Sequence, residues 1–144
     1  LDIIAEVVRA VSIPVIGNGG INSSADAINM LIETGCAGLA IARGAMGRPW
    51  IFAEVRAALE GKEFGEPNLR ERIQAAIAHL RAMCEDKGER GVFEARGAIT
   101  HYIKGMRGAA QARDAICRAG SAAEMEAILL RLLDESERGD GYTD

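Results

Sequence analysis

The sequence contains few of the residues that build metal sites, disulfide frameworks or membrane spans. Its three cysteines, Cys36, Cys84 and Cys117, form no C-x-x-C pair and have no histidine at ligand spacing, which argues against a zinc site or a disulfide framework. An odd cysteine count fits a reducing cytoplasm, where each cysteine can be an inert buried thiol. No apolar run approaches the roughly 20 residues that a membrane-spanning helix needs. We therefore expect a cytoplasmic protein with no metal and no membrane partner.

Aromatic residues are also scarce, at six of 144, while 49% of the residues are hydrophobic and 26% are charged. This composition is globular and excludes a disordered or collagen-like chain. The net charge of −4 argues against a generally basic nucleic-acid binder. The charge is uneven, however, because residues 88–118 hold six basic and three acidic side chains, and residues 119–144 hold two and seven. A basic surface confined to one segment is thus compatible with the acidic total.

Helices and strands alternate in the predicted structure of the first part of the chain. The predicted elements are helix 1–11, strand 13–16, helix 23–35, strand 37–42 and helix 50–60. This order implies parallel strands, buried on both faces and joined by right-handed crossovers. The first domain is therefore α/β and covers residues 1–61.

From residue 68 onward the pattern is helical throughout. After a helix-free linker at 62–67, apolar spacing and capping residues predict four helices, over 68–88, 92–107, 109–118 and 122–134. The polar end of the chain, 135–144, is expected to be a disordered tail. The second domain is therefore an all-α bundle over residues 68–134.

Two glycine-rich turns follow the two predicted strands. The first is Gly17-Asn18-Gly19-Gly20 and the second begins with Arg43-Gly44. The carboxyl ends of parallel strands meet at one edge of a sheet, where α/β folds bind ligands. Glycines let an anion approach the backbone, helix N-termini direct N–H groups at it, and arginine adds a donor suited to phosphate. We predict a phosphate site, with simple tight turns as the alternative.

A second candidate site lies in the basic segment. Arg96, Lys104 and Arg107 are spaced by eight and three residues, so they are predicted to share one helix face. With Tyr102 between them, this face could contact RNA phosphates and a base, although a charged helix face can also be merely solvated. No nucleophile–base pair or pair of carboxylates is evident, so the residues alone identify no reactive centre.

Several motifs resemble those of the tRNA-dihydrouridine synthases, and the bacterial B-type branch looks nearest. The similar stretches are 13–21 (IPVIGNGGI), 34–38 (TGCAG), 42–52 (ARGAMGRPWIF) and, in the helical part, 102–108 (YIKGMRG). The resemblance extends from Leu1 to about residue 133. One departure lies in the bundle, where Gly97, Ala98 and His101 stand at the family's usual Lys, His and Trp positions.

The resemblance implies the last two strands of a (β/α)8 TIM barrel, followed by a helical tRNA-binding domain. It implies an oxidoreductase that reduces uridine in tRNA to 5,6-dihydrouridine, using FMN that is recharged by NADPH or NADH. The positions that would bind FMN are Asn18, Gly19, Gly20, Ala42 and Arg43. The positions that would contact tRNA are Arg96, Tyr102, Lys104 and Arg107. No oligomeric state is indicated.

The chain is expected to be a fragment that is inactive alone. It begins with Leu1, and none of its cysteines stands in the context of the family's general acid, so we expect that cysteine and the natural start upstream. One alternative is another FMN or phosphate-binding barrel enzyme, of dihydroorotate dehydrogenase type. Another is a noncatalytic RNA-binding remnant.

Overall fold

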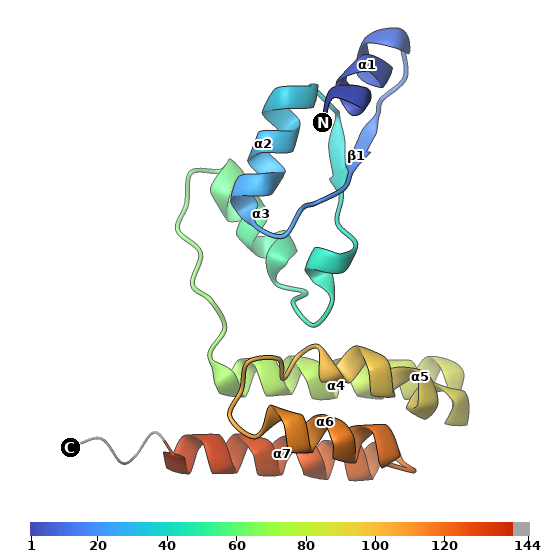
Figure 1. The fold of residues 1–144 in the computed structure, drawn as a ribbon, viewed down its shortest axis with the longest axis vertical. Helices are drawn as coiled ribbons and strands as arrows, with labels where there is room; N and C mark the ends of the chain where they lie inside the picture. The colour runs from blue at the N-terminus through green and yellow to red at the C-terminus, as the bar shows by residue number, and fades with distance from the viewer. Residues whose placement is uncertain (140–144) are drawn as a thin grey trace, which may run out of the picture. The chain divides into compact units, whose positions relative to one another are not determined.

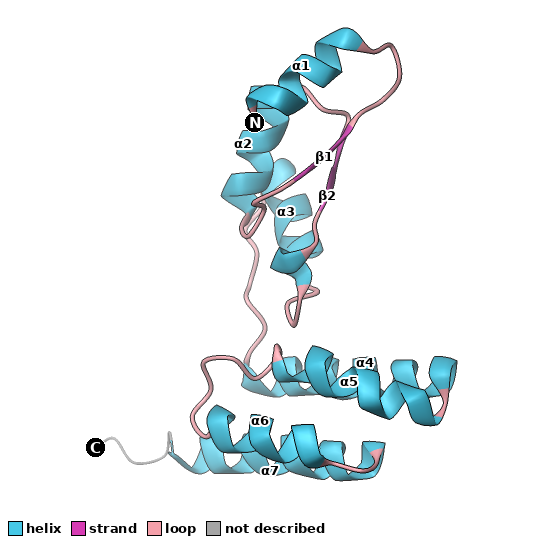
Figure 2. Ribbon diagram, turned by 45° about the vertical axis from the view of Figure 1, so that its right-hand side comes forward, coloured by secondary structure: helices cyan, strands magenta, loops and turns pink. Residues whose placement is uncertain are grey.

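A computed structural model describes residues 1–139. The chain divides into two compact units, with the boundary between Glu66 and Pro67 (Figure 1). The first unit contains helices and a small sheet, and the second consists of helices (Figure 2). Residues 62–68, around this boundary, have no regular secondary structure.

A two-stranded parallel sheet organises the first unit. The elements are α1 (Asp2–Ala10), β1 (Ile16–Asn18), α2 (Ser24–Thr34), β2 (Gly38–Ala40), the 3₁₀ helix η1 (Arg43–Ala45) and α3 (Ile51–Leu59). Ile16 lies opposite Gly38, Gly17 opposite Leu39 and Asn18 opposite Ala40. The predicted parallel pairing is therefore confirmed. The short helix η1 was not predicted.

Both strands differ from their predicted bounds. β1 begins at Ile16 rather than at Ile13, because Pro14 has no N–H to donate to a ladder. Hydrogen bonding between the two strand segments starts one residue before β1 and β2, where the Ala37 N–H donates to the Val15 carbonyl at 2.8 Å. β2 covers only the middle of the predicted strand 37–42.

The helices cover one face of the sheet. Buried side chains from α2 and α3, including Met30, Ile51 and Val55, pack together with Cys36 beneath the strands. Figure 2 shows the three helices on one side of β1 and β2. On the other side Ile16 is 58% exposed, and Ile13, three residues before β1, is 70% exposed. Burial of the strands on both faces was expected, and among the described residues only one face is covered.

The second unit consists of α4 (Leu69–Lys87), α5 (Glu89–Thr100), α6 (Ala109–Arg118) and α7 (Ala122–Gly139). α4 packs against both α5 and α7, and α6 packs against α5 and α7. The core is formed by fully buried side chains from every helix and from the turn after α5, namely Ile73, Leu80, Ile99, Ile103, Ile116, Met125 and Leu129. Asn68 and Glu71 form a complete capping box at the start of α4.

Two helices end at places other than those predicted. α5 stops at Thr100 instead of 107. The turn that follows contains Gly105 and Gly108 with φ of 84° and 78°, so a helical path could not have continued to 107. α7 continues past the predicted end at 134 to Gly139. Ser136 is buried, and Arg70 on α4 donates to both carboxylate oxygens of Glu137 at 2.7 Å. The expected disorder over 135–139 is therefore wrong, and residues 140–144 lie outside the described residues.

The α4–α5 contact generates a stability prediction. A Cβ at Gly91 would overlap the Met83 carbonyl oxygen and stand 2.8 Å from the Cα of Cys84, whereas a Cβ at Gly97 would meet nothing within 4 Å. Gly91→Ala should lower the free energy of unfolding by about 1–3 kcal/mol through overpacking. Gly97→Ala should raise it by up to about 1 kcal/mol through helix propensity. Urea unfolding followed by circular dichroism measures both, and equal effects would contradict the close helix contact.

Candidate functional site

The loops after β1 and β2 form a pocket of about 320 Å³. The residues that line it all come from these loops and the strand ends, namely Asn18, Gly19, Gly20, Ile21, Asn22, Ala40, Ala42, Arg43 and Gly44. The five residues expected from the sequence to hold the cofactor are among them. The structure therefore brings those five residues together, although α2 and β2 separate the first three from the last two along the chain.

Strand register and one close contact set the spacing of the two loops. Asn18 lies opposite Ala40, and its side-chain Nδ2 donates to the Ala40 carbonyl oxygen at 3.1 Å. On the second loop, a Cβ at Gly44 would overlap the carbonyl oxygen of Ile21. The two loops can approach this closely because position 44 has no side chain.

The pocket is suited to an anion. Gly19 and Gly20 have φ of 131° and 67°, and a Cβ built on either would meet nothing within 4 Å, so their backbone is open to a ligand. Arg43 is exposed and forms no ion pair with another described residue. None of the lining residues carries a carboxylate. An open glycine backbone beside an unpaired guanidinium is a setting that favours phosphate.

The first turn of α2 is satisfied within the protein. The Ser24 N–H donates to Glu54 Oε1 at 3.1 Å, and the Asp26 N–H donates to the Ser23 hydroxyl at 3.2 Å. The Asp26 carboxylate in turn accepts from the Asn22 N–H, and this bond is the largest cause that holds the pKa of Asp26 below its ordinary value. Backbone donors for an anion must therefore come mainly from the glycine loop rather than from these helix N–H groups.

An ion pair behind the pocket was not indicated by the sequence. Arg48 Nη2 donates to Glu54 Oε2 at 2.5 Å, and Arg48 Nη1 donates to the Asn22 carbonyl at 2.8 Å. The Glu54 side chain is only 14% exposed. Glu54 thus joins α3 to Arg48 and to the start of α2, which fixes the loop between β1 and α2. Its partners lie 6 and 30 residues away, so no local pattern signals the contact.

In the second unit, the predicted RNA-contacting residues separate into two groups. Lys104 and Arg107 are exposed in the turn between α5 and α6 and have no ion pair with the residues that the structure describes. The prediction that they share a helix face with Arg96 is wrong, because α5 ends at Thr100. Arg72, which the sequence did not indicate, donates from Nη2 to the carbonyls of Tyr102 and Lys104 at 3.0 and 3.2 Å, and so holds this turn.

Arg96 and Tyr102 make contacts inside the helical unit. Arg96 donates from Nε and Nη2 to the Ala119 carbonyl at 3.1 and 2.6 Å, and its guanidinium lies 4.6 Å from the centre of the Phe93 ring. Tyr102 is 4% exposed, its hydroxyl lies 3.1 Å from His79 Nδ1, and burial raises the pKa of Tyr102. Both side chains therefore join helices and support the turn.

The three cysteines differ in burial and are all free. Cys36 is buried, Cys84 is partly buried and Cys117 is exposed. No group of three or more metal-ligating side chains occurs within residues 1–139. Of the helices that the structure describes, none combines the length and the apolar character needed to cross a membrane.

Comparison with known proteins identifies the family. A family model described as dihydrouridine synthase (Dus) matches residues 1–137. The chain belongs to the dihydrouridine synthase family. The resemblance inferred from its motifs is therefore confirmed, and a B-type dihydrouridine synthase is among its relatives.

Named relatives come from several bacteria. The chain is 37% identical to "Probable tRNA-dihydrouridine synthase 1" of Synechocystis, over 88% of this chain and 36% of that protein. It is 36% identical to "Probable tRNA-dihydrouridine synthase" of Mycobacterium leprae, over 84% and 32%. It is 39% identical to "tRNA-dihydrouridine synthase B" of Shewanella oneidensis, over 71% and 32%. The chain thus spans about a third of the length of these dihydrouridine synthases.

The Glu54 contacts generate a second stability prediction. Glu54→Ala should lower the free energy of unfolding by about 1–3 kcal/mol, because it leaves the Ser24 N–H and Arg48 without their partly buried acceptor. The matched control is Glu60→Ala, which breaks only an exposed pair with Lys62 and should change stability by less than about 0.5 kcal/mol. Urea unfolding of the intact protein measures both, and a harmless Glu54→Ala would contradict an anchoring role.

Proposed function

We propose that the protein containing this chain reduces uridine in tRNA to 5,6-dihydrouridine, with FMN as cofactor and NADPH as reductant. The observation that carries the proposal is the pocket of the two loops, which combines open glycines with an unpaired arginine in a member of this family. The proposed place of action is the cytoplasm, where tRNA is available as substrate. Since the three relatives named above carry the name tRNA-dihydrouridine synthase, two of them with the word "probable", we prefer this function to that of a dihydroorotate dehydrogenase.

The first unit would then be the end of a (β/α)8 barrel. Its two parallel strands, joined through α2, match the repeating unit of such a barrel. The uncovered sheet face, with Ile13 and Ile16 exposed, supports this proposal, since barrel strands are buried on both faces by their neighbours and helices. The second unit would be the tRNA-binding domain.

The pocket residues fit the phosphate end of FMN. Gly19 and Gly20 would offer backbone N–H groups, and Arg43 would donate charge-assisted hydrogen bonds to phosphate oxygens. Asn18 would hold the two loops in register through its bond to Ala40. When bound, FMN would supply the hydride that reduces the uracil ring. The part of this chain is to bind and orient the cofactor at the strand ends.

The proposed tRNA contact lies in the turn between α5 and α6. Lys104 and Arg107 are the exposed cations there, and Arg72 holds the carbonyl of Lys104 in place. Arg96 and Tyr102 would support this contact indirectly, by packing the helices on either side of it. Backbone phosphates are the natural partners of such exposed cations.

Flavin binding tests the phosphate site. In the intact protein, Arg43→Ala should weaken FMN binding about 10- to 100-fold, which corresponds to losing a charge-assisted hydrogen bond of about 1.5–3 kcal/mol. Riboflavin, which has no phosphate, should bind both proteins equally. The control Arg56→Ala removes an exposed arginine of α3 outside the pocket. Fluorescence titration of the apoprotein measures each affinity, and FMN binding that is equally tight in Arg43→Ala would refute the assignment.

Salt-dependent tRNA binding tests the turn. Lys104→Ala with Arg107→Ala should reduce affinity for tRNA and lower the slope of log Kd against log salt by about 0.7–0.9 for each phosphate that is no longer neutralised. Lys62→Ala with Arg56→Ala removes the same charge from the first unit and should leave the slope unchanged. Filter binding over a series of salt concentrations measures the slopes. Binding curves that coincide for the unsubstituted protein and both double variants would rule out the turn as a tRNA contact.

A further inference from the structure

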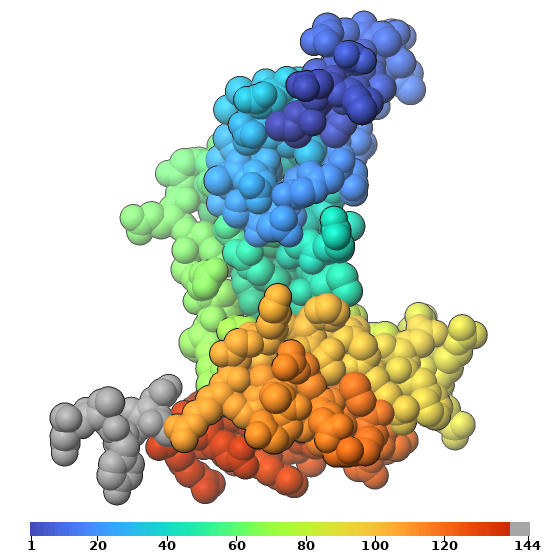
Figure 3. Space-filling model, viewed as in Figure 1, coloured from blue at the N-terminus to red at the C-terminus, as the bar shows by residue number. Residues whose placement is uncertain are grey.

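An open groove of about 890 Å³ runs between α6 and α7 in the helical unit. The two helices pack against each other, and atoms of both reach the same surface, orange for α6 and red for α7 in Figure 3. Residues 128, 131, 135 and 138 of α7 line the groove and follow a spacing of three and four, so they form one stripe along the helix. The neighbouring stripe, with Met125 and Leu129, is buried in the core.

Three arginines that form no ion pair with another described residue line the groove. Arg107, Arg131 and Arg138 line it together with a single carboxylate, that of Glu135. None of the three arginines forms an ion pair with another residue of the described part of the chain. By contrast, four arginines elsewhere on the helical unit are paired with carboxylates, namely Arg70, Arg81, Arg90 and Arg118. Among the exposed arginines of the helical unit that have no ion pair with a described residue, three line the groove and Arg113 on α6 lies outside it. Most of these unpaired guanidinium groups are thus found where one anionic partner could reach them.

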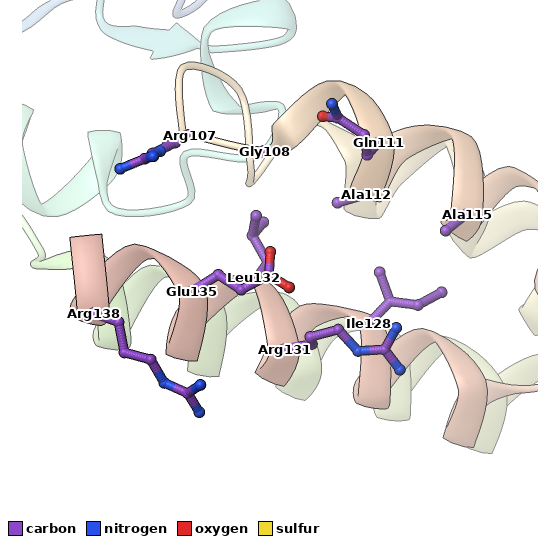
Figure 4. A pocket seen from close by; sticks show the side chains of 10 residues that line it. All are labelled: Arg107, Gly108, Gln111, Ala112, Ala115, Ile128, Arg131, Leu132, Glu135 and Arg138. Atoms are coloured by element: carbon purple, nitrogen blue, oxygen red, sulfur yellow. The ribbon is translucent and has the colours of Figure 1, made fainter.

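The spacing of these arginines favours a polyanion over a small anion. Figure 4 shows Arg107 extending outward from the turn before α6, while Arg131 and Arg138 project from α7. Arg131 and Arg138 are seven residues apart on the helix, which is about 10 Å along its axis. The two guanidinium groups lie apart in Figure 4, so a chain with repeated phosphates can contact both as they stand, whereas one phosphate group would have to draw both side chains together.

The lining also favours a sugar-phosphate backbone over an apolar helix or a stacked base. None of the ten lining residues is aromatic, so no ring is present on which a base could stack. On the α6 side the groove is formed by small or polar residues, such as Ala112, Ala115 and Gln111. Ile128 and Leu132 are the only large apolar side chains of the lining, while guanidinium groups and an amide can bond to phosphate and ribose oxygens.

We propose that the α6–α7 groove is a second binding surface for the tRNA backbone, in which Arg131 and Arg138 contact phosphates. This inference rests on the proposed function and extends it, because Arg107 belongs both to the groove and to the proposed contact turn. The tRNA backbone would continue from the turn with Lys104 and Arg107 onto α7. Contacts of this kind add affinity and set orientation without reading sequence.

The test is the double substitution Arg131→Gln with Arg138→Gln in the intact protein, with an unmodified tRNA transcript as probe. Affinity should fall about tenfold, and the slope of log Kd against log salt should fall by about 1.5. Arg90→Gln with Arg113→Gln removes the same charge from the same unit outside the groove and should bind as the unsubstituted protein does. Arg131→Lys with Arg138→Lys keeps the charge and should keep the salt slope, which separates charge loss from misfolding.

The possible outcomes distinguish a failure of the groove assignment from a failure of the proposed function. If the unsubstituted protein and the variant with both Arg→Gln substitutions bind tRNA equally well, the assignment of the groove is overturned and the proposed function stands. If the Gln pair binds tRNA normally but loses self-association in sedimentation velocity, the proposal is overturned in favour of an interface between copies of the chain. If the unsubstituted protein retains FMN but fails to bind tRNA even at low salt, the proposed function fails, and the groove assignment fails with it.

Discussion

The parallel register of β1 and β2 is the constraint on which the candidate cofactor site depends. Pairing of Asn18 with Ala40 ends both strands at the same edge, so the loops that follow must leave the sheet side by side. Two further contacts then fix those loops, the bond from Asn18 to Ala40 and the close approach of Gly44 to Ile21. An ion pair anchored on α3 holds the other end of the first loop. A shift of one residue in register would misalign all of these contacts.

The features that could be predicted from the sequence are those that depend on residues close together in the chain, such as helices, strands and caps. Apolar runs and capping residues predicted the parallel strands and most helices, and Ser23 does cap α2 as its spacing to Asp26 indicates. The end of α5 was predicted too late, although the glycines that follow it signal a turn. The bonds from Arg96 to Ala119 and from Ser24 to Glu54 span 23 and 30 residues, and tertiary packing alone brings their atoms together. Local spacing therefore suggested Arg96 as a cation on an RNA-contacting helix face. It could not show that the Arg96 side chain bonds to the Ala119 carbonyl inside the helical unit.

The helical unit shows how an acidic chain can present a cationic surface. Several of its carboxylates are used in ion pairs: Glu94, Glu126 and Glu137 are each paired with a basic side chain. This pairing neutralises much of the surface, and the hydrogen bond from Arg81, reinforced by its charge, holds the pKa of Glu126 below its ordinary value. The exposed cations without an ion pair among the described residues, in the turn after α5, on α6 and on α7, then determine which surfaces attract a polyanion. Net charge, at −4, conceals this distribution.

The bare face of the small sheet has a consequence for handling the protein. Among the described residues each strand has only one neighbour, so both β1 and β2 are edge strands with a row of backbone groups open to pairing. Ile13 and Ile16 add exposed apolar surface beside that row. The strands are three residues long and Pro14 interrupts the segment before β1, which limits how far a foreign strand could extend the sheet. Concentrated solutions of this chain should therefore self-associate through the first unit, and should do so as small oligomers rather than as fibrils.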